Sequence, residues 1–98
     1  MVEVSFRTRR LERCYRDSNR AIRQWGPQVG RRFVQRIDAL LEARGRSDIQ
    51  AVRAYDLHPL AGSRSGQHAL RLTGQVRLIV SFESETSVTI EEVVDYHD

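Results

Sequence analysis

Apolar and polar side chains alternate at the start of the chain and then recur at helical spacing. Val2, Val4 and Phe6 alternate with polar residues, which is typical of a strand with one buried face. Thr8 is suited to cap a helix, and the apolar positions that follow it predict a short helix from about residue 8 to 18. The chain is therefore predicted to begin with a strand and a helix.

A second helix is predicted after a break at Gly26-Pro27, because proline suits the first turn of a helix. Its apolar residues recur at helical spacing, at Val29, Phe33, Ile37, Leu40 and Leu41. Gly45 is suited to end this helix. Ile22 and Trp25 either extend the first helix or pack from the connection, and burial is expected for Trp25. The two helices are expected to form an αα-hairpin.

The second half of the chain carries the strongest strand signals. Strands rich in β-branched residues are predicted over residues 67–72, 75–82 and 87–94. A two-residue turn at Thr73-Gly74 is predicted between the first two. Residues 46–54 are ambiguous, with Ser47 a candidate cap for a single helical turn. Residues 59–66 are predicted as a loop with little regular structure.

The order β-α-α-β-β-β predicts an α+β fold. Because the strands gather after the helices, both helices are expected on one face of a mainly antiparallel sheet, and the first strand must pair with a later one. A length of 98 residues fits a single domain, expected to span residues 1–98. The single cysteine, Cys14, cannot form an internal disulfide and is expected to pack as a small apolar group.

Charge is distributed unevenly along the chain. All 16 basic residues are arginines, and they lie within residues 1–80 with seven acidic residues, whereas residues 81–98 hold six acidic residues and no arginine. A codon-biased genome would explain the choice of arginine over lysine, but the clustering of charge fits a polyanionic partner. No apolar run is long enough to span a membrane, and the N-terminus lacks the pattern of a signal peptide, so a cytoplasmic location is expected.

Several groups suited to phosphodiester chemistry lie near the predicted hairpin. His58 precedes Pro59 in a turn, Arg71 and Arg77 lie on the hairpin, and the chain ends in Asp95-Tyr96-His97-Asp98. Imidazoles transfer protons near neutral pH, and guanidinium groups stabilise a phosphorane. We expect these side chains to converge on one positively charged surface.

Three segments in order resemble a known family. The Leu-His-Pro-Leu segment at 57–60, the hairpin segment from 69 to 79 and the terminal Asp-Tyr-His resemble the HigB branch of the RelE/ParE toxin superfamily, the plasmid maintenance system killer proteins. The resemblance implies a ribosome-dependent endonuclease that cuts mRNA in the ribosomal A site without a metal or other cofactor. It also implies a HigA-like antitoxin with a helix-turn-helix domain, through which the toxin would reach operator DNA.

The resemblance assigns roles to individual residues. His58 is expected to transfer a proton or contact the phosphate, Arg77 to clamp the phosphate, and Tyr96 to stack on a base. Proton transfer is expected from His97 or Asp95. In an extended strand Asp95 and His97 share one face and Tyr96 takes the other.

RNA contacts are expected from three further residues, Arg64, Arg71 and Gln75. A two-residue turn would place Arg71 and Arg77 on opposite faces of the hairpin, whereas a three-residue loop or a bulge would place both on one face. The chain departs from the family at Ala61, where many relatives carry a lysine. Arg64 is a candidate substitute for that charge.

Other activities are compatible with the same fold. A ParE-like inhibitor of DNA gyrase would lack the predicted cluster of His58 with the terminal residues. A catalytically weak module that binds RNA or the ribosome is compatible with Ala61. A zinc site is not expected, because His58, His68 and His97 lack ligand spacing and Cys14 lies in a predicted helix. His68 is expected on the solvent side or the surface of the sheet.

Overall fold

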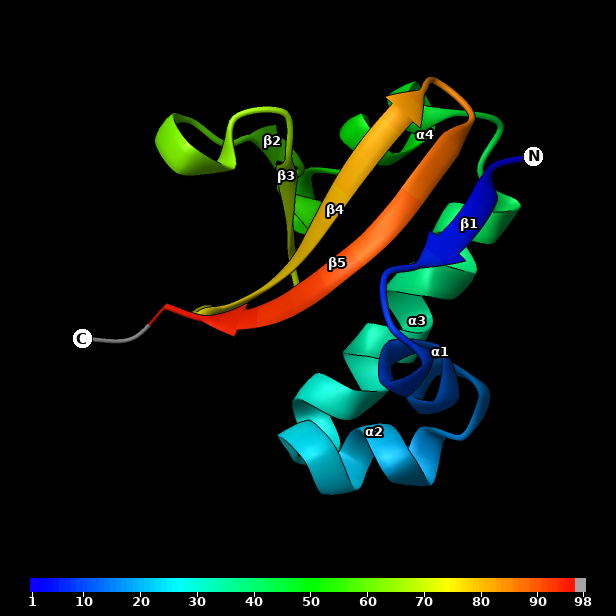
Figure 1. Ribbon diagram of the computed structural model, residues 1–98, viewed down its shortest axis with the longest axis vertical. Helices are drawn as coiled ribbons and strands as arrows, with labels where there is room; N and C mark the ends of the chain where they lie inside the picture. Colours follow the sequence, from blue (N-terminus) through cyan, green and yellow to red (C-terminus); the bar gives the residue numbers. More distant parts are fainter. Residues whose placement is uncertain (97–98) are drawn as a thin grey trace.

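The computed structural model describes residues 1–96 and packs helices against one face of a five-stranded sheet (Figure 1). The strands are β1 (Glu3–Phe6), β2 (His58–Pro59), β3 (His68–Arg71), β4 (Val76–Ser84) and β5 (Ser87–Asp95). The helices are α1 (Arg9–Arg16), α2 (Ser18–Trp25), α3 (Pro27–Glu42) and α4 (Arg46–Gln50), with 3₁₀ turns η1 (Arg53–Tyr55) and η2 (Gly62–Arg64). The predicted α+β class is confirmed. No helix within residues 1–96 has the length and apolar character needed to cross a membrane.

The sheet is mixed, with strand order β1-β5-β4-β3-β2. The first strand pairs with the last in parallel, and every other neighbouring pair is antiparallel, as the prediction of a mainly antiparallel sheet requires. Figure 1 shows β1 beside β5 at one edge, with β2 at the other. The row formed by Leu70, Leu78 and Val93 across three strands points toward the helices and contributes to the core.

The core lies between the sheet and α3, which crosses behind the strands in Figure 1. Phe33, Ile37 and Leu40 of α3 are fully buried, as their helical spacing predicts, whereas Leu41 of the same predicted set is 36% exposed. Trp25, at the end of α2, packs against Phe33 with 4.6 Å between ring centroids and is partly buried. The predicted burial of Cys14 is confirmed.

Two arginines of α3 hold the hairpin of β3 and β4 from the helix side. Arg32 donates from Nη1 to the carbonyl of Leu72 at 2.9 Å, and Arg36 donates from Nε to the carbonyl of Arg71 at 3.0 Å. Arg36 is buried and stacks 4.5 Å from the ring centroid of Tyr55, and this burial lowers the pKa of its guanidinium. The hairpin is therefore fixed to the scaffold through its backbone.

The predicted first helix, from about residue 8 to 18, is present as α1, and the residues after Asp17 form a separate helix, α2. Thr8 caps α1 as predicted, since its Oγ1 accepts from the backbone N–H of Leu11 at 3.1 Å. Asp17 has extended backbone angles, its N–H donates to the carbonyl of Arg13, and its carboxylate accepts from the N–H of Asn19 at 3.0 Å. One residue thus ends α1 and caps α2, and Ile22 and Trp25 lie on the second of these helices.

The helices α2 and α3 meet closely at Gly30. A Cβ built on Gly30 would lie 2.7 Å from the carbonyl carbon of Ala21 and 2.7 Å from the amide nitrogen of Ile22. Both neighbours are backbone atoms, so a side chain at this position would force the helices apart. Pro27 begins α3 as predicted, directly after Gly26, whose φ of 88° lies in the left-handed region.

The connecting segments are more ordered than predicted. The helix α3 ends at Glu42, and Gly45 precedes α4 as its N-cap with extended backbone angles, so it does not end α3 as expected. The segment 46–54, which the sequence left ambiguous, contains α4 and the start of η1, and the candidate cap Ser47 lies inside α4 and is not its cap. The loop predicted over residues 59–66 contains part of β2 and all of η2.

Candidate functional site

Arg71 and Arg77 lie directly opposite each other on β3 and β4. Paired residues of neighbouring strands point to the same face, so both arginines leave the sheet on the side away from α3. The predicted two-residue turn is wrong. A three-residue loop, residues 73–75, joins the strands and is closed by a hydrogen bond from the N–H of Leu72 to the carbonyl of Val76 at 2.9 Å.

Thr73 explains why the loop holds three residues. Its hydroxyl oxygen accepts from the backbone N–H of Gln75 at 3.4 Å and of Val76 at 3.1 Å. Arg77 adds to this from Nη1, which donates to the carbonyls of Thr73 at 2.7 Å, Gly74 at 3.3 Å and Val76 at 3.2 Å. One edge of the Arg77 guanidinium is therefore used to close the loop, while Nε and Nη2 have no hydrogen-bond partner among residues 1–96.

His58 lies on the same face of the sheet as the two arginines. It pairs with Ala69, which pairs with Ile79, which pairs with Glu92, so these four side chains form a row across four strands. This row is two residues along the strands from the Arg71–Arg77 pair, or roughly 7 Å. The His58 side chain is 46% exposed, so its ring is accessible to a ligand on this face.

The backbone of Asp56 determines which ring nitrogen of His58 carries a proton. Nδ1 of His58 lies 2.9 Å from the carbonyl oxygen of Asp56, and a carbonyl can only accept a hydrogen bond. A neutral His58 therefore carries its proton on Nδ1 and leaves the Nε2 lone pair free to accept one. Asp56 adopts a left-handed conformation with φ of 48°, and its carboxylate lies 3.8 Å from the same nitrogen.

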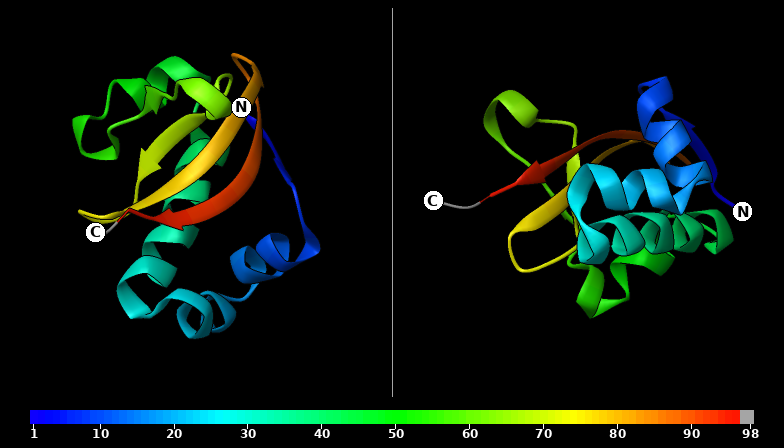
Figure 2. Two further views of the ribbon diagram at one scale, coloured as in Figure 1. Left: turned by 60° about the vertical axis from the view of Figure 1, so that its left-hand side comes forward. Right: turned by 90° about the horizontal axis from the view of Figure 1, so that it is seen from below.

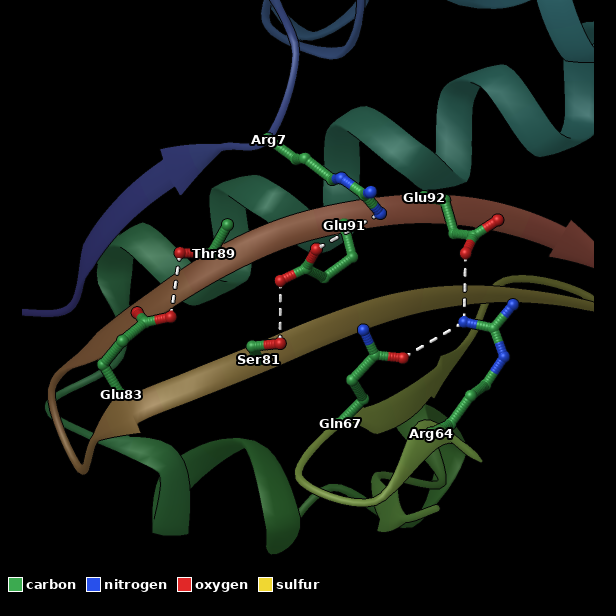
Figure 3. A network of polar contacts seen from close by, with 8 residues as sticks. All are labelled: Arg7, Arg64, Gln67, Ser81, Glu83, Thr89, Glu91 and Glu92. Atoms are coloured by element: carbon green, nitrogen blue, oxygen red, sulfur yellow. Dashed lines mark hydrogen bonds and ion pairs between the residues drawn. The ribbon is translucent and has the colours of Figure 1, made fainter. Parts of the chain in front are cut away.

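The segment between β2 and β3 folds over this face (Figure 3). Nη1 of Arg64, in η2, donates to Oε1 of Gln67 at 3.1 Å and lies 3.0 Å from Oε2 of Glu92 on β5. This ion pair reaches across β3 and β4, over the row that holds Ala69 and Ile79. Those two residues are buried although they lie outside the main core cluster. Arg64 is thus held at the candidate site with its charge opposed by a carboxylate.

An acidic group on this face was not predicted from the sequence. The pairing of β4 with β5 is irregular between Ile79 and Val80, so Glu91 is an extra residue in β5 and points to the same side as Glu92 (Figure 3). Glu91 accepts from the hydroxyl of Ser81 at 2.8 Å and lies 3.8 Å from Arg7. The sequence signal for this irregularity was the pair of consecutive acidic residues, Glu91 and Glu92, within the predicted strand.

The C-terminal residues divide between the two sides of the sheet. The N–H of Tyr96 donates to the carbonyl of Gln75 at 2.8 Å, which extends the strand pairing by one residue, and 51% of Tyr96 is exposed. Strand alternation places Tyr96 on the side of Arg77 and Asp95 on the side of the helices. Asp95 pairs with Val76 and lines a hollow of about 310 Å³ on that side. The structure therefore brings His58, Arg71, Arg77 and Tyr96 to one face but separates Asp95 from them, and His97 lies outside the described residues.

His68 does not belong to this face. It pairs with Val80, which is in the core, and its ring meets the edge of Phe82 with 5.6 Å between centroids. Burial, followed by the positive charge of Arg46, lowers the pKa of His68. The expected surface position is wrong, because the ring is partly buried against Phe82 on the helix side of the sheet.

Comparisons with known proteins agree with this architecture. Residues 4–97 match the family described as the RelE-like toxin HigB of type II toxin–antitoxin systems. No curated protein matches the sequence. Three solved structures share the fold. YafQ from E. coli is 12% identical, with a TM-score of 0.63 over 97% of this chain and 93% of that chain, and YoeB in its complex with YefM from Staphylococcus aureus is 16% identical, with a TM-score of 0.60 over 100% and 99% of the two chains. A chain of the RelBE2 toxin–antitoxin complex from Mycobacterium tuberculosis is 21% identical, with a TM-score of 0.51 over 98% of each chain.

The identities to these structures are low, so the structural likeness bears on the fold alone. The family match spans nearly the whole chain, from the first residues of β1 to the C-terminal segment that follows β5. The chain belongs to the HigB-like toxins, the RelE-like toxins of type II toxin–antitoxin systems.

Proposed function

We propose that this toxin is an endoribonuclease that cuts mRNA on the ribosome by attack of the RNA's own 2′-hydroxyl. The observation that carries the proposal is the shared face of His58, Arg71 and Arg77, with Nδ1 of His58 held by the Asp56 carbonyl so that Nε2 is available as a base. RNA can be cut without a metal because its nucleophile is built in, and the protein must only move protons and stabilise charge.

The proposed reaction assigns one task to each group. Nε2 of His58 removes the proton of the 2′-hydroxyl, the 2′-oxygen bonds to phosphorus, and the bond from phosphorus to the 5′-oxygen breaks. Arg71 and Arg77 stabilise the charge of the phosphorane. Asp95 lies on the helix side, so of the two candidate acids we assign protonation of the leaving 5′-oxygen to His97. The products are a 2′,3′-cyclic phosphate and a 5′-hydroxyl.

The remaining predicted residues are proposed to bind the substrate. Tyr96 is exposed on the side of Arg77 and is proposed to stack on a base, which contributes roughly 1–3 kcal/mol in single-strand recognition. Arg64 and Gln75 are proposed to contact the RNA backbone beside it. Ala61 lies exposed in the segment that carries Arg64, so the charge that relatives supply there by lysine would come from Arg64 in this chain.

The partner proposed for inhibition is a cognate antitoxin of the HigA-like, helix-turn-helix class. Similar folds are found in complexes with antitoxins, namely DinJ with YafQ in E. coli and YefM with YoeB in Staphylococcus aureus. Binding of operator DNA would occur through that antitoxin.

The test compares two histidines on opposite faces of β2 and β3. His58→Gln is expected to lower mRNA cleavage by about 10²–10⁴-fold, because it removes a general base. His68→Gln is the matched control and should retain cleavage. Both are read by primer extension on mRNA after expression in cells, with chelator added to extracts to test for a metal. Full cleavage by His58→Gln would overturn the proposal.

A second candidate function is a module that binds RNA without cutting it. It is favoured by Ala61, which carries no charge, and by the ion pair that opposes Arg64 with Glu92. Growth arrest without mRNA cuts would support this candidate. DNA damage without mRNA cuts would instead indicate a gyrase inhibitor.

A further inference from the structure

Four arginines line a hollow between α1 and α2, and two of its lining residues, Arg10 and Gln24, also line a neighbouring hollow that reaches Glu91 and Glu92 of β5. The hollow has a volume of about 240 Å³ and is lined by Arg10, Arg13, Cys14, Arg20, Arg23 and Gln24. Arg10 and Arg13 lie one turn apart on α1, and Arg20 and Arg23 lie one turn apart on α2. The sharp break at Asp17 turns these two arginine pairs toward each other, so the hollow exists because the helices are separate.

Most of the positive charge in this hollow is not neutralised by the protein. Asp17 lies 3.7 Å from Arg20, in an exposed pair that contributes little. Arg10 donates to the side-chain oxygen of Gln24, which is neutral. Among residues 1–96, Arg13 and Arg23 have no hydrogen-bond or ion-pair partner for their side chains. Four like charges around one hollow repel one another unless an anion joins them.

We propose that this hollow, named here the α1–α2 arginine site, binds the phosphodiester backbone of RNA at a place separate from the sheet face. Guanidinium groups bind phosphate oxygens in a bidentate manner, and two arginine pairs can hold successive phosphates. No step of RNA cleavage is assigned to this site.

The composition of the lining favours RNA over an acidic protein. Protein interfaces have an apolar centre rich in aromatic residues, whereas nucleic-acid interfaces are polar and strongly positive. The hollow contains five polar side chains and a buried thiol, with no aromatic or aliphatic side chain in its lining. Burial raises the pKa of Cys14, so the thiol stays neutral and leaves the charge of the arginines unopposed.

The α1–α2 arginine site and the sheet face of the candidate site are separate surfaces, so RNAs of different lengths can test the proposal. Figures 1 and 2 place α1 and α2 at the opposite end of the molecule from β2 and η2, which carry His58 and Arg64, and the longest dimension of the protein is 32 Å. Arg77 and Tyr96 are nearer to α2, since their neighbours Val76 and Asp95 line a hollow with Gln24, but they lie on the other side of the sheet. A short RNA can occupy one surface only, whereas a longer one can reach both. The α1–α2 arginine site should therefore affect long RNA more than short RNA.

The experiment measures binding of single-stranded RNA with 2′-O-methyl groups, which cannot be cut, as a function of salt. Arg13→Gln with Arg23→Gln should lower the slope of log K against log salt by about 1.4 for a strand of about 16 nucleotides, because two phosphate contacts are lost. The same double variant should leave the binding of a strand of about 4 nucleotides to the sheet face nearly unchanged.

The matched control removes two arginines that line no part of the hollow, Arg31→Gln with Arg44→Gln, both exposed and without side-chain partners among residues 1–96. An equal loss of slope in both double variants would show attraction by net charge alone and overturn the proposal. An unchanged slope in the Arg13→Gln with Arg23→Gln variant would also overturn the proposal. The remaining occupant of the α1–α2 arginine site would then be an acidic protein surface. Because the RNA cannot be cleaved, either result is independent of the proposed nuclease activity.

Discussion

At the scale of single residues, Arg77 is both a structural residue and a candidate ligand for phosphate. Nη1 donates to three carbonyls of the hairpin loop, and Nε and Nη2 have no hydrogen-bond partner among residues 1–96. Arg77→Lys keeps the charge but cannot reach the three carbonyls in the same geometry. We expect it to lose about 1 kcal/mol of unfolding free energy, measured in urea, together with most of the mRNA cleavage.

Arg71 separates these two effects, because its side chain is exposed and makes no loop contact among the described residues. Arg71→Lys should weaken cleavage while the free energy of unfolding stays within about 0.5 kcal/mol of the wild type. If both lysine variants retained full cleavage, neither guanidinium would stabilise the phosphorane.

The pKa of His68 predicts how stability responds to acid. Burial lowers this pKa in the folded protein below the unfolded value of about 6.5, so below that pH the unfolded state binds more protons. Neutral His68 therefore makes its full contribution to the free energy of unfolding above pH about 6.5. This contribution is lost as the pH falls below that value toward the lowered pKa of the folded protein. His68→Gln should lose less stability than the wild type between pH about 7.5 and about 5.5 in urea titrations. Parallel losses in the two proteins would contradict this.

Short sequence motifs point to the candidate residues but carry little information about which side chains surround them in space. His58 and Arg77 were named as candidates from short segments of sequence that resemble the family, and their roles remain proposals. The ion pair between Arg64 and Glu92 joins residues 28 positions apart through the register of four strands, so no local pattern contains it. The same holds for the contact of Glu91 with Arg7.

At the scale of elements, the helix boundary at Asp17 shows what apolar spacing cannot reveal. Leu11, Cys14 and Ala21 are buried, and their spacing is compatible with one helix as well as with two. The break depends on the extended backbone of Asp17 and on the hydrogen bond that the Asn19 N–H donates to its carboxylate. The available signal was Asp17, a residue type that caps helices, at the end of the predicted first helix.

The hairpin loop shows a similar limit of dipeptide signals. Thr73-Gly74 is compatible with a two-residue turn, but the Thr73 hydroxyl bonds to two backbone N–H groups further on and enlarges the loop to three residues. This shift of one residue decides whether Arg71 joins Arg77, since a change of register by one moves a side chain to the other face.

The close approach of α2 and α3 at Gly30 gives a prediction for stability. Gly30→Ala would place a Cβ 2.7 Å from backbone atoms of Ala21 and Ile22, which cannot move independently of α2. We expect a loss of about 3 kcal/mol of unfolding free energy, because the helices must separate and part of the core loosens. Urea denaturation followed by circular dichroism measures it.

Gly74→Ala is the matched control, since a Cβ at Gly74 would meet no atom within 4 Å. Its free energy of unfolding should change by less than about 0.5 kcal/mol. Equal effects of the two substitutions would mean that α2 and α3 do not pack as described.

At the scale of the whole molecule, the fold class followed from the order of the elements, whereas the arrangement of charge did not follow from the sequence. Within residues 81–96, acidic side chains of the C-terminal part of the chain meet arginines from earlier segments. Glu91 and Glu92 lie on β5 and meet Arg7 from the chain leaving β1 and Arg64 from η2 (Figure 3). Acidic residues late in the chain thus oppose arginines from earlier segments beside the candidate site.

This arrangement predicts that removing one carboxylate strengthens RNA binding. Glu92→Gln should release Arg64, raise the affinity for uncleavable RNA and steepen the slope of log K against log salt by about 0.7, which corresponds to one additional phosphate contact. Glu42→Gln removes the same charge from the exposed end of α3 and is the matched control. If the two variants gained equally, net charge alone would be responsible. If only Glu92→Gln gained, and Arg64→Gln cancelled the gain, then the ion pair with Glu92 limits how much of the Arg64 charge this toxin presents to RNA in the segment that also carries Ala61.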